Sequence, residues 1–190
     1  MVRRKQLDFY ETPPQFTKLL LSYIGIHIKE SVFECCNGGG AITQELRNNH
    51  FTVQTNDIDI KHKADMHFDA TESAVWNTLS PSWVISNPPF SSAARIVPLA
   101  FQSAKHGIAF LLRLTYLEPC SNRKDFLSLY PPSIIVLPRY SFTKDGGHDS
   151  VTCAWFIWRK GPVDRPRGHQ HKALVHIATR EDVEEFSDEC

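Results

Sequence analysis

The sequence predicts an α/β protein with a Rossmann-like, seven-stranded sheet that is mostly parallel, has an antiparallel last strand and carries helices on both faces. Strand and helix patterns alternate along residues 14–138, which is typical of a parallel sheet covered on both sides. The strands expected at 133–137 and 151–158 are joined by a loop that is too short for a helical crossover, so they should be antiparallel neighbours.

Helix and turn signals define the first half of the chain. Pro14 suits the first turn of a helix, and the apolar residues that follow it recur at helical spacing. Three glycines at 38–40 break the chain between a strand and the next helix. The elements expected in this half are a helix at 14–28, a strand at 31–36, a helix at 41–49, a strand at 51–56, a short strand at 64–68 and a helix at 72–79.

Apolar runs define the strands of the second half. The run at 83–86 is short and bounded by turn signals, and the run at 151–158 is apolar on both faces, as in a buried strand. We expect one domain over residues 1–160, followed by a polar extension over 161–190 with an acidic tail. The elements expected here are a strand at 83–86, a helix at 93–105, a strand at 107–114, a short helix ending near 130, strands at 133–137 and 151–158, and a possible edge strand at 173–178.

The bulk properties narrow the class of protein. Of the 190 residues, 42% are hydrophobic and 22% charged, which are globular values. No apolar run approaches the roughly 20 residues of a membrane span, and no apolar segment follows the basic residues 1–5, so we expect neither a membrane anchor nor a secretory signal. Five cysteines without Cys-x-x-Cys spacing predict reduced thiols, a cytoplasmic location and no metal site. Residues 1–180 carry a surplus of six positive charges, which suits a polyanionic partner or an ordinary solvated surface.

The segment Asn87-Pro88-Pro89-Phe90 follows the strand at 83–86 directly. Proline has no N–H and holds the residue before it extended. The segment therefore presents oxygen acceptors, the Asn87 side chain and the Pro88 carbonyl, beside an aromatic ring. An exocyclic amine on a flat ring suits such a site, because the amine donates to the oxygens while the ring stacks on Phe90. A tight turn that closes a core strand is the alternative interpretation.

Other polar or glycine residues follow neighbouring predicted strands. Ligands of open α/β sheets bind beyond the carboxyl ends of the strands, so the glycines at 38–40, Asp57 and Asn87 should line one rim. The glycines permit close approach of a ligand, and their spacing excludes a P-loop. Asp57 is placed to accept from ribose hydroxyls, or serves as a turn residue. Asp69 either accepts from an adenine amine or caps the next helix at Thr71.

Together these motifs resemble the class I S-adenosylmethionine-dependent methyltransferases, and within them the small phage- and prophage-type enzymes that methylate adenine N6. The resemblance covers most of residues 9–158. Residues 9–14 resemble the motif that closes over the cofactor, 34–40 the glycine motif, 87–90 the catalytic motif and 139–142 the late motif that holds the extruded base. It implies S-adenosylmethionine as cofactor. The cofactor-binding residues that it implies are Tyr10, Thr12, Pro13, Glu34, Cys36, Asn37, Gly38, Gly40, Asp57, Ile58, Asp69 and Asn87.

The resemblance also implies direct, in-line methyl transfer to the N6 amine of an adenine that has left the DNA stack. The catalytic residues would be Asn87, Pro88, Pro89 and Phe90. Their acceptor oxygens would draw the amine nitrogen towards tetrahedral geometry, and the rate would come from positioning and preorganised dipoles. No covalent intermediate is needed, so Cys35 and Cys36 are expected to be buried neighbours of the glycine motif. The substrate contacts that we expect are Phe90, Arg139, Phe142, Arg159 and Lys160.

Three functions follow, and the first is the one that we predict. It is methylation of adenine in double-stranded DNA by a monomer or homodimer, with short or relaxed specificity, because only the loops at 115–125 and 139–150 and the tail after 160 are available for recognition. The second is the same chemistry on RNA adenine or on a protein glutamine amide. The third is a non-catalytic binding protein that keeps the fold.

Overall fold

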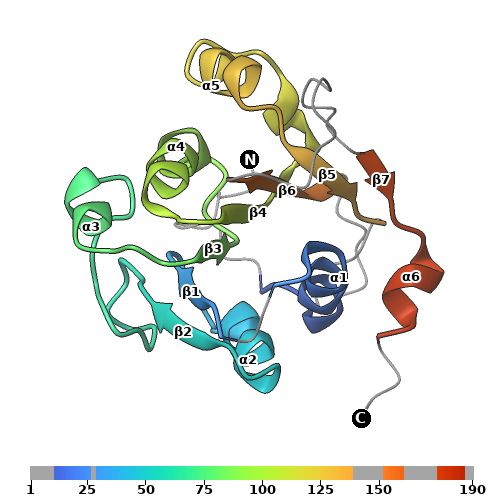
Figure 1. Ribbon diagram of the computed structural model, residues 1–190, viewed down its shortest axis with the longest axis horizontal. Coiled ribbons are helices and arrows are strands. Elements are labelled where there is room, and N and C mark those ends of the chain that lie inside the picture. The colour runs from blue at the N-terminus through green and yellow to red at the C-terminus, as the bar shows by residue number, and fades with distance from the viewer. Residues whose placement is uncertain (1–10, 27–28, 139–151, 161–174, 187–190) are drawn as a thin grey trace, which may run out of the picture.

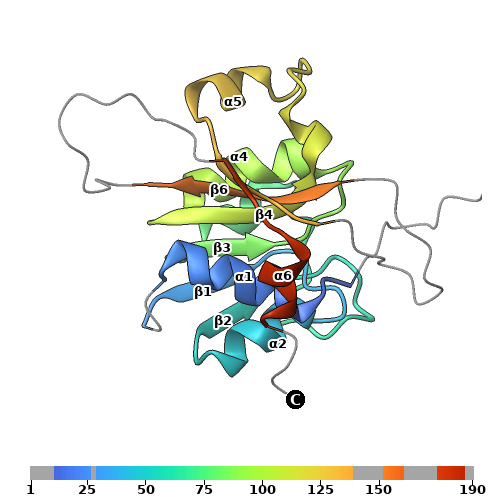
Figure 2. The same ribbon diagram turned by 90° about the vertical axis from the view of Figure 1, so that its right-hand side faces the viewer.

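The computed structural model describes residues 11–26, 29–138, 152–160 and 175–186. These residues form one seven-stranded sheet with helices packed around it (Figures 1 and 2). The predicted fold class is therefore confirmed. In spatial order the strands are β2 (Thr52–Thr55), β1 (Ser31–Glu34), β3 (Trp83–Ser86), β4 (Gly107–Arg113), β6 (Cys153–Arg159), β5 (Ser133–Val136) and β7 (Val175–Ile177).

The direction of the strands distinguishes the carboxyl ends of the parallel strands from their amino ends. Strands β1 to β4 are parallel, whereas β6 runs antiparallel between β4 and β5. After β2 the chain returns past β1 and forms β3 on its other side. The carboxyl ends of β1 and β3 thus flank the topological switch point, which is where α/β sheets bind ligands.

The prediction of a strand at 64–68 is wrong. The structure has only a single bridge there, between Asn56 and Met66. Side chains take the place of a ladder: the buried Asn56 amide donates to the Phe68 carbonyl at 3.0 Å and accepts from the Phe68 N–H at 2.9 Å. Asp65 in turn accepts from the backbone and hydroxyl of Thr55, each at 2.8 Å. Such local side-chain bonds compete with regular pairing. The seventh strand is instead β7, which lies within the edge strand expected at 173–178 and pairs parallel with β5.

Helices cover both faces of the sheet (Figure 1). One face carries α1 (Pro14–Ile24), α2 (Ala41–Asn48) and α6 (Arg180–Glu184), which pack into one apolar cluster with Val53 and Trp155. The other carries α3 (Ser73–Asn77), α4 (Ala93–Ser103) and α5 (Lys124–Leu129), whose cluster includes Phe110 and Phe156. No helix in the described ranges is long and apolar enough to cross a membrane.

The first helix ends earlier than its periodicity predicts. Gly25 adopts a φ of 55°, a left-handed conformation that suits glycine, and its N–H bonds to the Leu21 carbonyl at 3.4 Å. Apolar residues continue beyond Ile24, but the glycine closes the helix there. The Trp155 indole then ties this helix to the sheet by donating to the Phe16 carbonyl at 2.8 Å.

Substitution of Gly107 is expected to destabilise the sheet. A Cβ at this first residue of β4 would lie 2.5 Å from the Trp158 carbonyl oxygen and 2.7 Å from the Trp83 ring. The backbone oxygen cannot retreat without breaking the β4–β6 ladder, so Gly107→Ala should lower the free energy of unfolding by about 3 kcal/mol. Urea denaturation measures this change. In the control Gly25→Ala the new Cβ has nothing within 4 Å, so only backbone strain of about 1 kcal/mol remains. Equal midpoints for Gly107→Ala and the unmodified protein would contradict the expectation.

Candidate active site

The carboxyl edge of the parallel strands brings the glycine motif and the Asn-Pro-Pro-Phe segment together. Glu34 ends β1 and Ser86 ends β3, and the Ser86 hydroxyl donates a hydrogen bond to Glu34 Oε1 across the two strands. The strands are held in register by Val32 beside Trp83 and Phe33 beside Val84. Residues 35–40 and 87–90 therefore leave the sheet side by side.

The glycine bend is preformed by its own side chains and backbone. Gly38 and Gly40 have φ values of 52° and 83°, a region that other residues rarely adopt. Asn37 fixes the bend from within, because its amide donates to the Lys63 carbonyl at 2.7 Å and accepts from the Thr43 hydroxyl at 2.6 Å. The bend leads directly into α2, which begins at Ala41. A ligand would meet a shaped backbone surface here rather than a loop that must first order itself.

Glu34 is a buried acid beneath this bend. Its side chain is 1% exposed and accepts from the Cys36 N–H at 3.0 Å as well as from Ser86. Burial raises the pKa of Glu34 to about 8, and the nearby Asp57 adds to this, whereas the two hydrogen bonds act in the opposite direction. Glu34 is therefore mostly protonated at neutral pH.

The two cysteines of the motif do not form an activated nucleophile. The pKa of the Cys36 thiol is raised well above its ordinary value by a hydrogen bond with the Cys35 side chain and by burial. A thiolate, the reactive form, is thus disfavoured. Cys35 itself is fully buried. The burial expected for both cysteines is confirmed for Cys35, whereas Cys36 is only half-buried.

Asp57 joins the end of β2 to the glycine bend. Its Oδ2 accepts from the Gly38 N–H at 2.7 Å and its Oδ1 from the Asp59 N–H at 2.8 Å. Each carboxylate oxygen keeps further acceptor capacity, which a hydroxyl group of a ligand can use. Ile58 follows immediately and is 57% exposed, so an apolar surface adjoins the carboxylate.

Asp69 makes the local contacts of a turn residue. Its Oδ1 accepts from both the N–H and the hydroxyl of Thr71, each at 2.8 Å. These bonds lower the pKa of Asp69, the backbone bond most strongly. The helix α3 begins only at Ser73, so Asp69 stabilises the turn before that helix.

The Asn-Pro-Pro-Phe segment is oriented from the N-terminal side of the chain. Asn87 is half-buried, and its Nδ2 donates to the hydroxyl of the buried Thr12 at 3.0 Å. Since the amide nitrogen is directed to Thr12, the side-chain oxygen faces away from it. Phe90 is half-buried, and the Arg113 guanidinium carbon lies 4.7 Å from the centroid of its ring.

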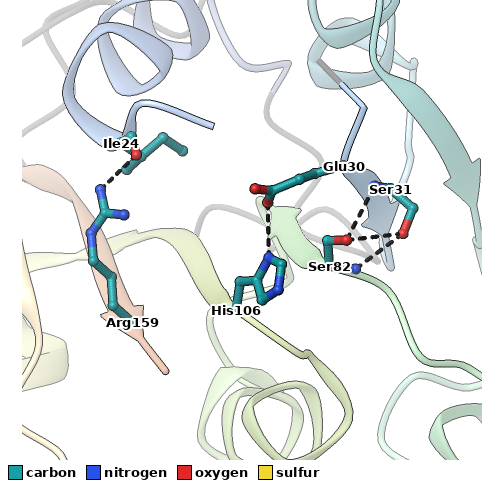
Figure 3. Close-up of polar contacts among 6 residues, drawn as sticks. All are labelled: Ile24, Glu30, Ser31, Ser82, His106 and Arg159. Carbon is teal, nitrogen blue, oxygen red and sulfur yellow. Dashed lines mark hydrogen bonds and ion pairs between the residues drawn. The ribbon is translucent and has the colours of Figure 1, made fainter. Parts of the chain in front are cut away.

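The structure does not bring Arg159 and Lys160 to this rim. Arg159 pairs with Gly107, the first residue of β4. Both cations therefore lie at the amino ends of the parallel strands, whereas Asn87 lies at their carboxyl ends. Figure 3 shows Arg159 there, donating to the Ile24 carbonyl at 2.7 Å near the contact between His106 and Glu30. Lys160 donates to the Gln102 and Ala104 carbonyls at 3.0 and 2.7 Å. Burial lowers the pKa of both cations, and both close the ends of helices.

Other predicted site residues are not open to comparison. Tyr10, Arg139 and Phe142 lie outside the described residues, as does the loop at 139–150. Within the described ranges, no group of three or more His, Cys, Asp or Glu side chains is arranged to hold a metal ion. Two residues near the site, Ser86 and Arg113, were not predicted from the sequence. Each is a polar residue at the carboxyl end of an apolar strand, and that position is the feature by which the sequence could have indicated them.

No protein-family model matches the sequence, and a search of curated proteins gives no significant match. Solved structures do match. A protein assigned to the class I S-adenosylmethionine-dependent methyltransferases from Listeria monocytogenes matches over 87% of this chain and 65% of its own, with 16% identity and a TM-score of 0.62. The methyltransferase subunit of a type I restriction-modification system from Streptococcus thermophilus matches over 94% and 52%, with 12% identity and a TM-score of 0.64. A protein assigned as an RNA methyltransferase from Pyrococcus horikoshii matches over 81% and 87%, with 15% identity and a TM-score of 0.59.

The chain spans about two thirds of the Listeria protein and about half of the Streptococcus subunit. At these identities the likeness concerns the fold. Its structural neighbours include class I methyltransferases and methylase subunits of restriction-modification systems, and the chain accordingly has the S-adenosylmethionine-dependent methyltransferase fold.

Proposed function

We propose that the protein is an S-adenosylmethionine-dependent methyltransferase that modifies the N6 amine of adenine in DNA. The observation that carries this proposal is the orientation of Asn87 at the switch point, where its amide nitrogen donates to Thr12. Pro88 and Phe90 follow it directly in the chain. This arrangement offers acceptors and an aromatic face to a planar amine. The preformed glycine bend lies beside it, as the binding of a nucleoside cofactor requires.

The residues of the rim fit S-adenosylmethionine. Gly38 and Gly40 bring backbone close to a ligand, and Asp57 and Ile58 offer an acceptor and an apolar surface for a nucleoside. Glu34 lies beneath the bend and fixes the Cys36 N–H and the Ser86 hydroxyl. Of the other residues implied by the resemblance, Cys36 and Asn37 belong to the bend itself, and Thr12, which Pro13 follows in the chain, accepts from the Asn87 side chain. When bound, the cofactor supplies a methyl group on a positively charged sulfur, which makes that carbon electrophilic.

The chain itself contributes position and polarity. The Asn87 oxygen and the Pro88 carbonyl accept the two N–H bonds of the amine, which withdraws its lone pair from conjugation with the ring. Phe90 replaces the stacking that a flipped base loses. Such preorganised acceptors cost no reorganisation during the reaction and account for most of the proposed rate.

A nucleic acid is preferred over a protein substrate because the surplus of six positive charges over residues 1–180 suits a polyanion. DNA is the first candidate because several type I restriction-modification subunits are among the structural neighbours, and the RNA methyltransferase neighbour makes RNA the second. The loop after β4 is a fixed recognition candidate, because the Arg123 side chain donates to the carbonyls of Tyr116 at 2.8 Å and Thr115 at 3.1 Å. Such a small element supports short or relaxed specificity by a monomer or homodimer.

Radiolabelled cofactor distinguishes the candidate functions. The full chain is incubated separately with double-stranded DNA, structured RNA and a protein mixture, and the labelled products are digested and identified by mass spectrometry. The proposal requires N6-methyladenine from DNA. Label confined to RNA adenine or to glutamine would establish the second function, and cofactor binding without transfer to any substrate would establish a non-catalytic binding protein.

Loss of the Thr12 hydroxyl is expected to reduce activity by misorienting Asn87. In Thr12→Val the Asn87 amide nitrogen loses its acceptor at nearly constant side-chain volume. A neutral hydrogen bond contributes about 1 kcal/mol, so kcat should fall roughly fivefold. The control Thr12→Ser keeps the hydroxyl and should retain most of the activity. Steady-state methylation assays compare the two variants, and equal losses in both would show that packing at Thr12 matters rather than its hydroxyl.

A further inference from the structure

Arg113 extends from the sheet over the Asn-Pro-Pro-Phe segment. It is the last residue of β4, and Ser86, the last residue of β3, pairs with Phe110. β4 therefore continues three residues beyond the end of β3, towards the side on which Asn87 and Phe90 emerge. The guanidinium carbon rests 4.7 Å from the centroid of the Phe90 ring, the ring proposed to stack on the target base.

The guanidinium of Arg113 lacks the polar contacts that Arg47, Arg95, Arg123 and Arg159 make. Its Nε is buried and has no hydrogen-bond partner, and no ion pair among the described residues includes it. Arg123 and Arg159, in contrast, donate to backbone carbonyls. An unpaired buried donor costs about 1–3 kcal/mol. A fold that keeps such a group beside its candidate active site offers it to a ligand.

We propose that Arg113 binds the phosphate of the nucleotide whose base is methylated. This inference rests on the proposed function, since it assumes a nucleic-acid substrate with an extruded base. A base that stacks on Phe90 carries its own phosphate to the same part of the rim, within reach of a guanidinium that already contacts that ring. The planar fork of arginine matches phosphate oxygens, and the resulting charge-assisted bonds are about twice as strong as neutral ones.

A phosphate is a better partner than the edge of the base. Ring nitrogens of adenine are neutral acceptors and leave the positive charge of Arg113 uncompensated, whereas a phosphate neutralises it. The cation–π contact with Phe90 is worth about 0.5–2 kcal/mol for two half-buried groups. That is enough to hold the guanidinium in place before binding and small enough to yield to a phosphate.

The test compares Arg113→Gln with Arg113→Lys, which keeps the charge. Binding to a fluorescent duplex that the unmodified protein methylates is measured over a salt series, with S-adenosylhomocysteine present so that no methyl group is transferred. One phosphate contact contributes about 0.9 to the slope of log K against log salt concentration. The slope should therefore decrease by about 0.9 in magnitude in Arg113→Gln and remain in Arg113→Lys, while calorimetric affinity for the cofactor is unchanged in both. Thermal unfolding establishes that each variant is folded.

The outcomes separate this inference from the function on which it rests. If the unmodified protein methylates no DNA, the proposed function fails. If it methylates DNA and Arg113→Gln keeps the full salt slope, the phosphate assignment is overturned. An unchanged slope together with altered discrimination between adenine and 7-deazaadenine would place the guanidinium on the base edge and would equally overturn it.

Discussion

Replacement of Asn87 by alanine should lower kcat for methyl transfer by about 10²–10³-fold, the loss typical of one preorganised polar group in an active site. The side-chain oxygen of Asn87 is proposed to act on the amine as its nitrogen becomes tetrahedral, so most of its contribution should appear in the transition state. In that case kcat and kcat/KM fall by the same factor. Steady-state kinetics with tritiated cofactor measure both parameters, and calorimetry measures cofactor affinity, which should change only a few-fold.

A matched control removes an amide that lies away from the rim. Gln54 is an exposed residue of β2, and Gln54→Ala should leave all kinetic parameters unchanged. Asn87→Asp keeps an acceptor oxygen but loses the N–H that donates to Thr12, and its activity should fall between those of Asn87→Ala and the unmodified protein. Methylation by Asn87→Ala at the rate of the unmodified protein would refute the proposed role of this residue.

The second large effect concerns stability, which should decrease as pH rises because of Glu34. The folded state holds this acid with a pKa of about 8, against an ordinary value of 4.5. Between these values the unfolded chain binds fewer protons than the folded one, so the free energy of unfolding falls with rising pH. The contribution of Glu34 is intact below about pH 4.5, is lost progressively up to about pH 8 and is constant above it. Its full size is on the order of 5 kcal/mol.

Glu34→Gln should remove this dependence. The glutamine oxygen can still accept from the Cys36 N–H and the Ser86 hydroxyl, but the side chain no longer titrates. Urea denaturation at pH 5, 6, 7 and 8 should therefore show a stability advantage of the variant that grows with pH. The exposed acid Glu72 provides the control, since Glu72→Gln should leave the pH dependence of the unmodified protein in place. A constant difference between Glu34→Gln and the unmodified protein across this range would contradict the argument.

Much of the architecture follows from short apolar runs and from the residues that end them. The run at 83–86 and the proline pair after it predict β3 and its sharp end, because apolar periodicity and missing N–H groups are local properties. The segment at 64–68 shows where such reasoning fails. The backbone groups of Phe68 bond to the Asn56 side chain, and no local pattern reveals that a buried amide twelve residues away will take the place of a neighbouring strand there.

The candidate site was predictable to the extent that strand direction was used. Placing the glycines, Asp57 and Asn87 on one edge requires only that their strands be parallel. Arg159 follows the predicted strand at 151–158, which was itself expected to be antiparallel. The predicted topology therefore already places Arg159 at the amino ends of the parallel strands, away from Asn87. Arg113 was concealed in a different way. It ends a strongly apolar strand, where one charged residue resembles an ordinary boundary.

The insertion of β6 between β4 and β5 constrains how the chain is made. β6 follows both of its neighbours in sequence, so no hairpin or helical crossover can bring β5 against β4 beforehand. During synthesis on the ribosome, the facing sides of β4 and β5 stay unpaired until the chain has emerged as far as residue 159. Closing loops over such sequence distances is slow. The nascent chain is therefore most exposed to aggregation and to chaperones in the interval between translation of β5 and translation of β6.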